Sequence, residues 1–172
     1  RFLIAGGGIL LALPILWPRL DTYQQQRILV LFDPSIDAAG RGIRWQTNIS
    51  LRLLKNGGFT GQGLFHGSLV QSRAMAGLHT DFIFSSIGEE LGMVGCIAVL
   101  LLLFAIIARC VYVGVKSGNY MNRIICVGIA GMLASQVMVN VGMCIGVFPV
   151  VGLTLPFISY GGSSIVTMFA AM

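Results

Sequence analysis

The feature that most constrains this sequence is the distribution of its charges. No charged residue follows Arg123, so the chain from Ile124 to Met172 is uncharged. Across all 172 residues, 56% are hydrophobic and only 10% are charged. A soluble domain does not hide so long an uncharged stretch, whereas a helix that crosses a bilayer requires one. The sequence therefore excludes an ordinary soluble globular domain and predicts an all-α polytopic membrane protein.

Four apolar stretches are the predicted membrane spans. A transmembrane helix needs about 20 mostly apolar residues, because the hydrocarbon core is about 30 Å thick. Residues 82–115 and 124–147 satisfy this length. Residues 1–17 are shorter and are interpreted as part of a helix, and 161–172 as the start of a last helix. We therefore interpret the chain as a piece of a longer protein.

The connections between these spans predict an orientation. Loop 116–123 is short and carries Lys116 and Arg123, and short basic loops remain in the cytoplasm. Loop 18–81 and turn 148–160 then lie on the extracellular or periplasmic side. Loops as long as 18–81 are largely exempt from the positive-inside rule, so its basic residues do not contradict this orientation.

The long outer loop is basic. Before Asp81 it contains three aspartates and seven basic residues, which are Arg19, Arg27, Arg41, Arg44, Arg52, Lys55 and Arg73. Ordinary solvation or contact with anionic lipid headgroups explains this excess as well as a phosphate-bearing substrate does. We take Arg41, Lys55 and Arg73 as candidate substrate contacts, and we expect no nucleic-acid partner.

Because the chain has only six acidic residues, every carboxylate that could act as a general acid or base can be considered in turn. Three of them, Asp21, Asp33 and Asp37, lie among turn residues early in the loop. The others, Asp81, Glu89 and Glu90, lie at or within the first turns of the apolar stretch 82–115, where ionisable groups are costly and therefore functional hypotheses. For Asp81 two roles remain open: a cap at the helix start, or a general base at the lipid–water boundary.

Several neighbouring polar residues are candidates for site support. His79 and Thr80 immediately precede Asp81, and Glu89 is too far along a helix for a direct pair with it. In the third span Gln136 and Asn140 share a helix face, either bonding to another helix or lining a polar cavity. Ser159 and Ser163 lie in an uncharged turn after Pro156.

Metal and cofactor motifs are not found. The histidines, His66 and His79, do not form an i,i+4 pair, and the four cysteines have no CxxC spacing, so we predict no metal site or disulfide framework. The glycine-rich run Gly57–Gly67 matches no phosphate-binding fingerprint. It is better explained by turns and close backbone approach beside an interfacial helix, for which Trp45–Leu54 has the spacing.

Several motifs together carry a family resemblance. In order along the chain they are Asp33-Pro34, Gly57–Gly63, His79–Phe84, Gly88–Gly92, Val139–Met143 and Leu155–Ser164. From Arg27 onward the sequence resembles the SEDS proteins (shape, elongation, division and sporulation), that is, FtsW, RodA and SpoVE. It departs from the family pattern at Met75–Leu78, where the family's glutamate before the histidine is absent.

The resemblance implies a bacterial peptidoglycan glycosyltransferase in the plasma membrane, with about ten transmembrane helices of which this chain supplies about the last four. It implies that lipid II is the substrate, that a class B penicillin-binding protein and other divisome or elongasome proteins are partners, and that Asp81 is the essential aspartate. Basic residues or a divalent cation such as Mg²⁺ or Mn²⁺ would assist the leaving pyrophosphate. A lipid II flippase and a non-catalytic scaffold are the alternatives.

Overall fold

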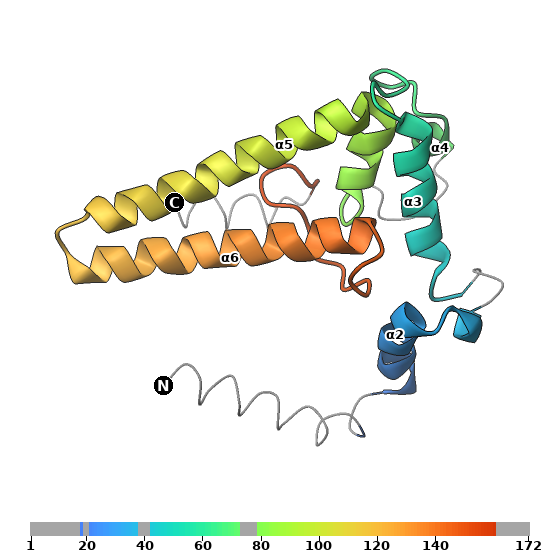
Figure 1. The fold of residues 1–172 in the computed structure, drawn as a ribbon, viewed down its shortest axis with the longest axis horizontal. Helices are drawn as coiled ribbons and strands as arrows, with labels where there is room; N and C mark the ends of the chain where they lie inside the picture. The colour runs from blue at the N-terminus through green and yellow to red at the C-terminus, as the bar shows by residue number, and fades with distance from the viewer. Residues whose placement is uncertain (1–17, 19–20, 38–41, 73–78, 161–172) are drawn as a thin grey trace. The chain divides into compact units, whose positions relative to one another are not determined.

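A computed structural model describes residue 18 and residues 21–37, 42–72 and 79–160. These described residues are largely helical and contain no strand, which confirms the all-α prediction. In chain order the elements are α2 (Thr22–Phe32), the 3-10 helix η2 (Pro34–Asp37), α3 (Trp45–Gly57), α4 (Ser68–Gln71), α5 (Ile83–Lys116) and α6 (Tyr120–Cys144) (Figure 1). The predicted partial spans 1–17 and 161–172 lie outside the described residues.

The chain divides into two compact units, residues 1–45 and 46–172. In the first, two aspartates organise turns, as the sequence predicts. The carboxylate of exposed Asp33 accepts hydrogen bonds from the backbone N–H (2.9 Å) and hydroxyl (2.6 Å) of Ser35. These bonds favour the charged form and lower the pKa of Asp33. Asp37 accepts from the backbone N–H groups of Gly42 and Arg44.

In the second unit, α5 and α6 form an antiparallel pair (Figure 1). Both helices are long and apolar enough to cross a membrane. Only 117–119 separates them, because helical structure extends beyond the predicted spans on both sides of that connection. The side chain of Asn119 accepts a hydrogen bond from the N–H of Met121 (3.0 Å), which caps the start of α6.

The helix α5 is broken at Gly92, which has φ 69° and ψ −165°. This backbone conformation is essentially restricted to glycine. The break separates 83–91 from 93–116, and Figure 1 shows the first part running at a sharp angle to the second. The sequence predicts the apolar stretch as one helix and does not predict this break.

The glycine-rich loop after α3 satisfies the backbone groups that the break leaves without helical partners. The N–H groups of Gln62 and Gly63 donate to the carbonyls of Glu89 (3.0 Å) and Glu90 (2.9 Å). In the other direction, the N–H groups of Met93 and Val94 donate to the carbonyls of residues 58 (3.0 Å) and 59 (3.3 Å). Buried backbone groups must be paired in this way where water is excluded.

Such bonding requires the two backbones to approach very closely. A Cβ atom added at Gly57 would overlap the carbonyl oxygen of Gly88, and one at Gly61 would overlap that of Glu90. The close approach predicted for the glycine-rich run is therefore present, and its partner is the broken part of α5.

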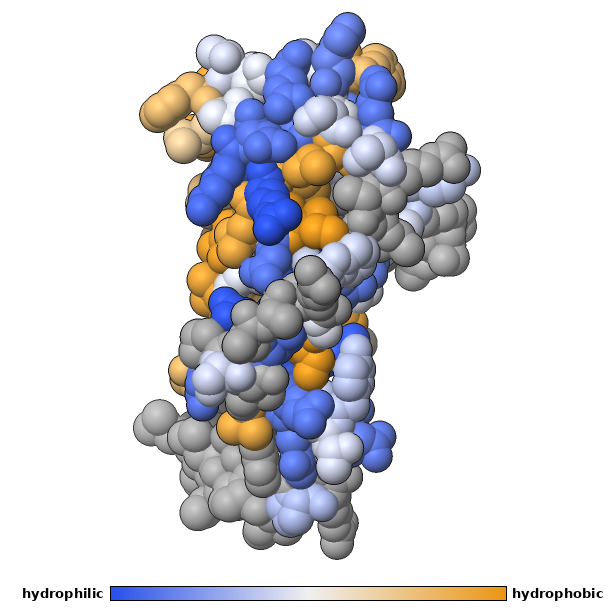
Figure 2. Space-filling model, turned by 90° about the vertical axis from the view of Figure 1, so that its right-hand side faces the viewer, coloured by the Kyte–Doolittle hydropathy of each residue, from blue (hydrophilic) through white to orange (hydrophobic). Residues whose placement is uncertain are grey.

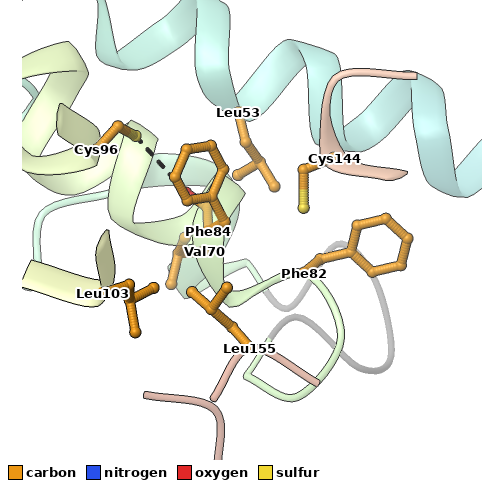
Figure 3. Close-up of a cluster of buried hydrophobic side chains, with 8 residues drawn as sticks. All are labelled: Leu53, Val70, Phe82, Phe84, Cys96, Leu103, Cys144 and Leu155. Carbon is orange, nitrogen blue, oxygen red and sulfur yellow. Dashed lines mark hydrogen bonds between the residues drawn. The ribbon is translucent and has the colours of Figure 1, made fainter. Parts of the chain in front are cut away.

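A buried cluster joins α3, α4, α5, α6 and the segment that follows α6. Figure 3 shows its eight members converging: Leu53, Val70, Phe82, Phe84, Cys96, Leu103, Cys144 and Leu155. Beside the cluster, the buried hydroxyl of Ser50 on α3 bonds to the hydroxyl of Ser85 (2.5 Å) and donates to the carbonyl of Cys144 (2.7 Å). Side-chain packing and this hydrogen-bonded junction together fix the start of α5 against α3 and the end of α6.

The helix α3 is amphipathic, as its predicted position at an interface requires. Ser50, Leu53 and Gly57 are buried, whereas Arg52 and Lys55 are exposed. Around α3 and α4, in the upper part of Figure 2, many hydrophilic side chains lie with apolar ones between them. This mixture is typical of a surface that meets water and lipid headgroups.

Candidate functional site

The backbone of His79–Asp81 is held by three consecutive hydrogen bonds. The N–H of Tyr160 donates to the carbonyl of His79 (3.0 Å), and the hydroxyl of Ser159 donates to that of Thr80 (2.7 Å). The side-chain amide of Asn140 donates to the carbonyl of Asp81 (2.9 Å). Two motifs far along the chain thus fix the segment that carries the candidate base.

Each side chain of this clamp is itself fixed by a further bond. Buried Asn140 also donates to the carbonyl of Leu153 (2.5 Å), and the hydroxyl of buried Ser159 accepts from the N–H of Leu155 (2.7 Å). The turn before Ser159 contains Phe157 at φ 63°, an uncommon conformation for a residue other than glycine. The loop after α6 is therefore a hydrogen-bonded support for residues 79–81.

The carboxylate of Asp81 itself is only partly buried, and no described residue donates a hydrogen bond to it. No side-chain bond caps the start of α5 among the described residues, which leaves the capping role without support. A Cβ atom added at Gly152 would lie 3.4 Å from Asp81 Oδ2, so the loop after α6 passes close to the carboxylate. Asp81 thus combines a fixed backbone with a carboxylate whose acceptor atoms are available.

A cavity of about 340 Å³ lies beside this segment. Its lining residues are Phe65, Val70, Gln71, His79, Ile83, Ser86, Ile87 and Glu90. The volume falls in the range of small-molecule sites, which are mostly apolar with a few polar groups. His79 belongs to the lining, so the segment 79–81 borders the cavity, although Asp81 is not itself a lining residue.

Glu89 directly precedes the lining residue Glu90 in sequence and is fully buried. Its carboxylate accepts from the N–H of Leu69 (3.1 Å, Oε1) and of Val70 (2.9 Å, Oε2), at the start of α4. The hydroxyl of Ser68 and the amide of Asn56 also donate to it, at 3.4 Å each. Glu89 therefore joins α5 to α4 and to the end of α3 and does not contact the segment 79–81.

The remaining predicted site residues are not joined to the segment 79–81 by any hydrogen bond or ion pair in the described structure. Lys55 is exposed on α3, and within the described chain no hydrogen bond or ion pair joins it to the other candidates. Arg41, Arg73 and Ser163 lie outside the described residues. Among the residues that are described, no three His, Cys, Asp or Glu side chains come together as a metal cage.

Sequence reasoning missed the break at Gly92 and the contribution of Ser50. The sequence does contain a signal for the break: it has glycines both at Gly88–Gly92 and in the run Gly57–Gly67. Two glycine-containing segments can approach backbone to backbone, which would have indicated that the loop contacts this part of α5. Ser50 lies on the apolar face of α3, where a polar residue is buried only with a partner.

The fold and this site define a helical integral membrane protein whose polar site lies where a broken membrane helix meets the loops at its end. The sequence matches the FtsW/RodA/SpoVE family, described as cell cycle proteins, over residues 1–172, and the chain belongs to that family.

Relatives and solved structures agree with this assignment. The chain is 38% identical to the peptidoglycan glycosyltransferase MrdB of Escherichia coli K12, over 92% of this chain and 42% of that protein. It is 40% identical to the probable peptidoglycan glycosyltransferase FtsW of Lactococcus lactis, over 95% of this chain and 37% of that protein. The chain thus spans less than half the length of these curated relatives.

Two solved structures are similar. One, a peptidoglycan synthase complex described as coordinating polymerization and crosslinking, aligns with a TM-score of 0.74 at 34% identity, covering 98% of this chain and 45% of that chain. The other, the rod shape determining protein RodA of Thermus thermophilus, aligns with a TM-score of 0.56 at 33% identity, covering 95% and 52% respectively.

Proposed function

We propose that this chain provides the candidate base and part of the substrate cavity of a peptidoglycan glycosyltransferase that polymerises lipid II into glycan strands. The single observation that carries the proposal is Asp81, whose backbone is clamped while its carboxylate remains without a described donor. The names of the relatives, peptidoglycan glycosyltransferases, support the same reaction class.

The reaction needs a base at this position. A hydroxyl oxygen of the acceptor sugar forms a bond to the anomeric carbon of the donor, the bond from that carbon to the pyrophosphate oxygen breaks, and the hydroxyl proton passes to the Asp81 carboxylate. His79 borders the cavity, where its ring can contact the sugar. Thr80, Asn140 and Ser159 are site support, because they hold or form the backbone next to the base.

The leaving pyrophosphate requires positive charge. Arg41, Lys55 and Arg73 in the outer loop are our candidates for it. The described residues do not form a protein cage for a divalent cation, so we assign no step to one. Magnesium is commonly held by one or two carboxylates together with substrate phosphates, which makes cation dependence a question for titration.

The proposal places loop 18–81 and the cavity on the extracellular or periplasmic side of the bacterial plasma membrane. A class B penicillin-binding protein and other divisome or elongasome proteins are the proposed partners. The similarity to a synthase complex that combines polymerization with crosslinking supports this pairing. Membrane lipids contact the apolar faces of α5 and α6.

The test is Asp81→Asn in the full chain, reconstituted with its penicillin-binding partner and supplied with lipid II. General bases contribute about 10²–10⁴-fold to rate, so glycan synthesis is expected to fall by about that factor. Asp21→Asn is the matched control, because Asp21 is exposed and makes no side-chain cap bond.

Undiminished polymer from Asp81→Asn would remove the assignment. Movement of lipid II across vesicle membranes without any polymer, in the unsubstituted protein, would favour the flippase. Loss of partner binding as the only defect of α5 variants would favour the scaffold.

A further inference from the structure

We propose that Glu89 is a positioning residue that sets the width of the cavity beside Asp81 and so places the substrate headgroup relative to the base. This inference rests on the proposed function, because it concerns the same cavity. It explains why an acidic residue is buried inside an otherwise apolar helix.

The first step is the geometry of the cavity walls. One wall comes from the loop and α4 through Phe65, Val70 and Gln71, and the other from His79 and the first part of α5. The Glu89 carboxylate joins the first part of α5 to α4, because it accepts a hydrogen bond from the N–H of the lining residue Val70 (2.9 Å). Movement of α4 away from Glu89 would therefore widen the cavity.

The second step is the weakness of α4 as an independent element. It has four residues, Ser68–Gln71, and no side chain of its N-cap residue Gly67 closes its first turn. A helix this short does not form by itself in water. The N–H of Ser68 donates to the side chain of Gln62 (3.1 Å), and the next two N–H groups, those of Leu69 and Val70, donate to Glu89. The position of α4 on α5 therefore depends on the Glu89 carboxylate.

The third step is the close fit around the carboxylate. A Cβ atom added at Gly67 would lie 2.8 Å from Glu89 Oε2, which is shorter than real Cβ contacts. Glu89 is fully buried and its own carbonyl accepts from Gln62. Both the backbone and the side chain of this residue thus hold the loop that leads into α4.

The fourth step is the requirement for two acceptor oxygens. Leu69 N–H donates to Oε1 and Val70 N–H donates to Oε2. Glutamine has the same shape but only one oxygen, so in Glu89→Gln one buried N–H faces an amide NH₂ group. An unsatisfied buried donor is costly enough to release α4.

The experiment compares Glu89→Gln and Glu89→Asp with the unsubstituted full chain, in complex with its partner. We expect Glu89→Gln to accelerate hydrogen exchange of the peptide that contains Ser68–Gln71 by about tenfold or more. We expect KM for lipid II to rise about tenfold or more, because the cavity no longer holds the headgroup in place. Glu89→Asp keeps both oxygens and should retain more of both properties.

Two controls separate positioning from general destabilisation. Ser72→Ala removes a hydrogen bond of α4, from the Ser72 hydroxyl to the carbonyl of Leu69 (2.9 Å), which does not reach α5. It should leave KM unchanged. The pH dependence of kcat should be the same in Glu89→Gln as in the unsubstituted chain, because Glu89 is not the base.

Unchanged exchange and unchanged KM in Glu89→Gln would overturn the inference. A large fall in kcat with an altered pH profile would also overturn it, since that result would make Glu89 a base. If Glu89→Gln does not accumulate, Glu89→Asp is measured in its place: its side chain is one methylene shorter, so exchange of Ser68–Gln71 and KM should both rise, and unchanged values of both would overturn the inference. Full activity of Asp81→Asn would refute the proposed base and leave the exchange result for α4 standing.

Discussion

The two parts of α5 differ in what they contact, although they are continuous in sequence. In residues 83–91, the side chains of Phe84, Ser85, Ser86 and Glu89 are buried. In 93–116, large apolar side chains such as Leu101 and Phe104 are more than 60% exposed. The first part is packed by protein, whereas the second contributes Cys96 and Leu103 to the buried cluster on one face and presents an apolar surface suited to lipid on the other.

This difference teaches where polar groups are tolerated in such a helix. Before the break, the buried polar side chains of Ser85 and Glu89 are hydrogen-bonded to other parts of the protein, Ser85 to Ser50 and Glu89 to α4. Beyond it, no acidic residue occurs on α5 at all. The broken backbone and the buried polar side chains therefore occur in the same part of the helix, because the protein packed around that part supplies hydrogen-bonding partners that a bilayer lacks.

The largest expected effect comes from changing the break itself. Gly92→Ala should cost about 3 kcal/mol or more, because strain in this region of φ/ψ space costs about 1–3 kcal/mol and the new Cβ would also contact the backbone of residues 59 and 61. Thermal unfolding of the full chain in detergent measures this, together with its yield.

The control for that substitution lies on α6. Added Cβ atoms at Gly128 and Gly131 would meet nothing within 4 Å, so Gly128→Ala and Gly131→Ala should be neutral or stabilise by up to about 1 kcal/mol. Equal loss of stability from Gly92→Ala and Gly131→Ala would contradict the distinction between the break and the regular helices.

The second expected effect concerns Asn140, whose amide joins the carbonyls of Asp81 and Leu153. Asn140→Leu keeps a similar size but leaves two carbonyls without this donor, which should cost about 2–4 kcal/mol. Glycan synthesis should fall as well, because the clamp on the base is lost. Unfolding and polymerisation assays on the same preparation measure both.

Gln136, one turn earlier on the same helix, provides the comparison. Within the described residues its buried Oε1 has no hydrogen-bond partner, and neither has Asn140 Oδ1. Only Asn140 donates to the carbonyls of residues 81 and 153, so Gln136→Leu should be neutral or stabilising, since it removes an unsatisfied acceptor and no such donor. If Gln136→Leu lowered stability and glycan synthesis as much as Asn140→Leu, the two amides would have the same role, and the hydrogen bonds of Asn140 to residues 81 and 153 would not account for the effect.

Sequence reasoning reached much of this arrangement and failed at identifiable points. The apolar lengths of α5 and α6 and the absence of charge after Arg123 were enough to predict a helical membrane protein. The count of acidic residues made Asp81 a candidate base and the resemblance favoured that role over a cap, and the motifs around Asn140 and Ser159 now have a structural reason to occur with it. The particular hydrogen bonds were not predictable, because they depend on which backbone carbonyl a loop presents after folding.

The break at Gly92 was missed for a related reason. Hydropathy reports only whether residues suit lipid, and it remains high across Leu91, Gly92 and Met93. Whether a glycine in such a stretch is helical or bent depends on a partner that supplies N–H and carbonyl groups, here the loop after α3. That partner is about thirty residues away in sequence, beyond the reach of any local pattern.

The smallest expected effect compares two phenylalanines on either side of the break. Phe84 is buried in the cluster, whereas Phe104 is 69% exposed on the apolar face. Phe84→Leu should cost about 1 kcal/mol or more through lost packing, and Phe104→Leu about 0.5 kcal/mol or less, because lipid fills the space that a smaller side chain leaves. Unfolding of both variants in bilayers or bicelles is the measurement. Similar losses for the two would mean that 93–116 is also packed by protein on the face of Phe104, and the contrast between the two parts of α5 would then lie in their hydrogen bonds and not in what surrounds them.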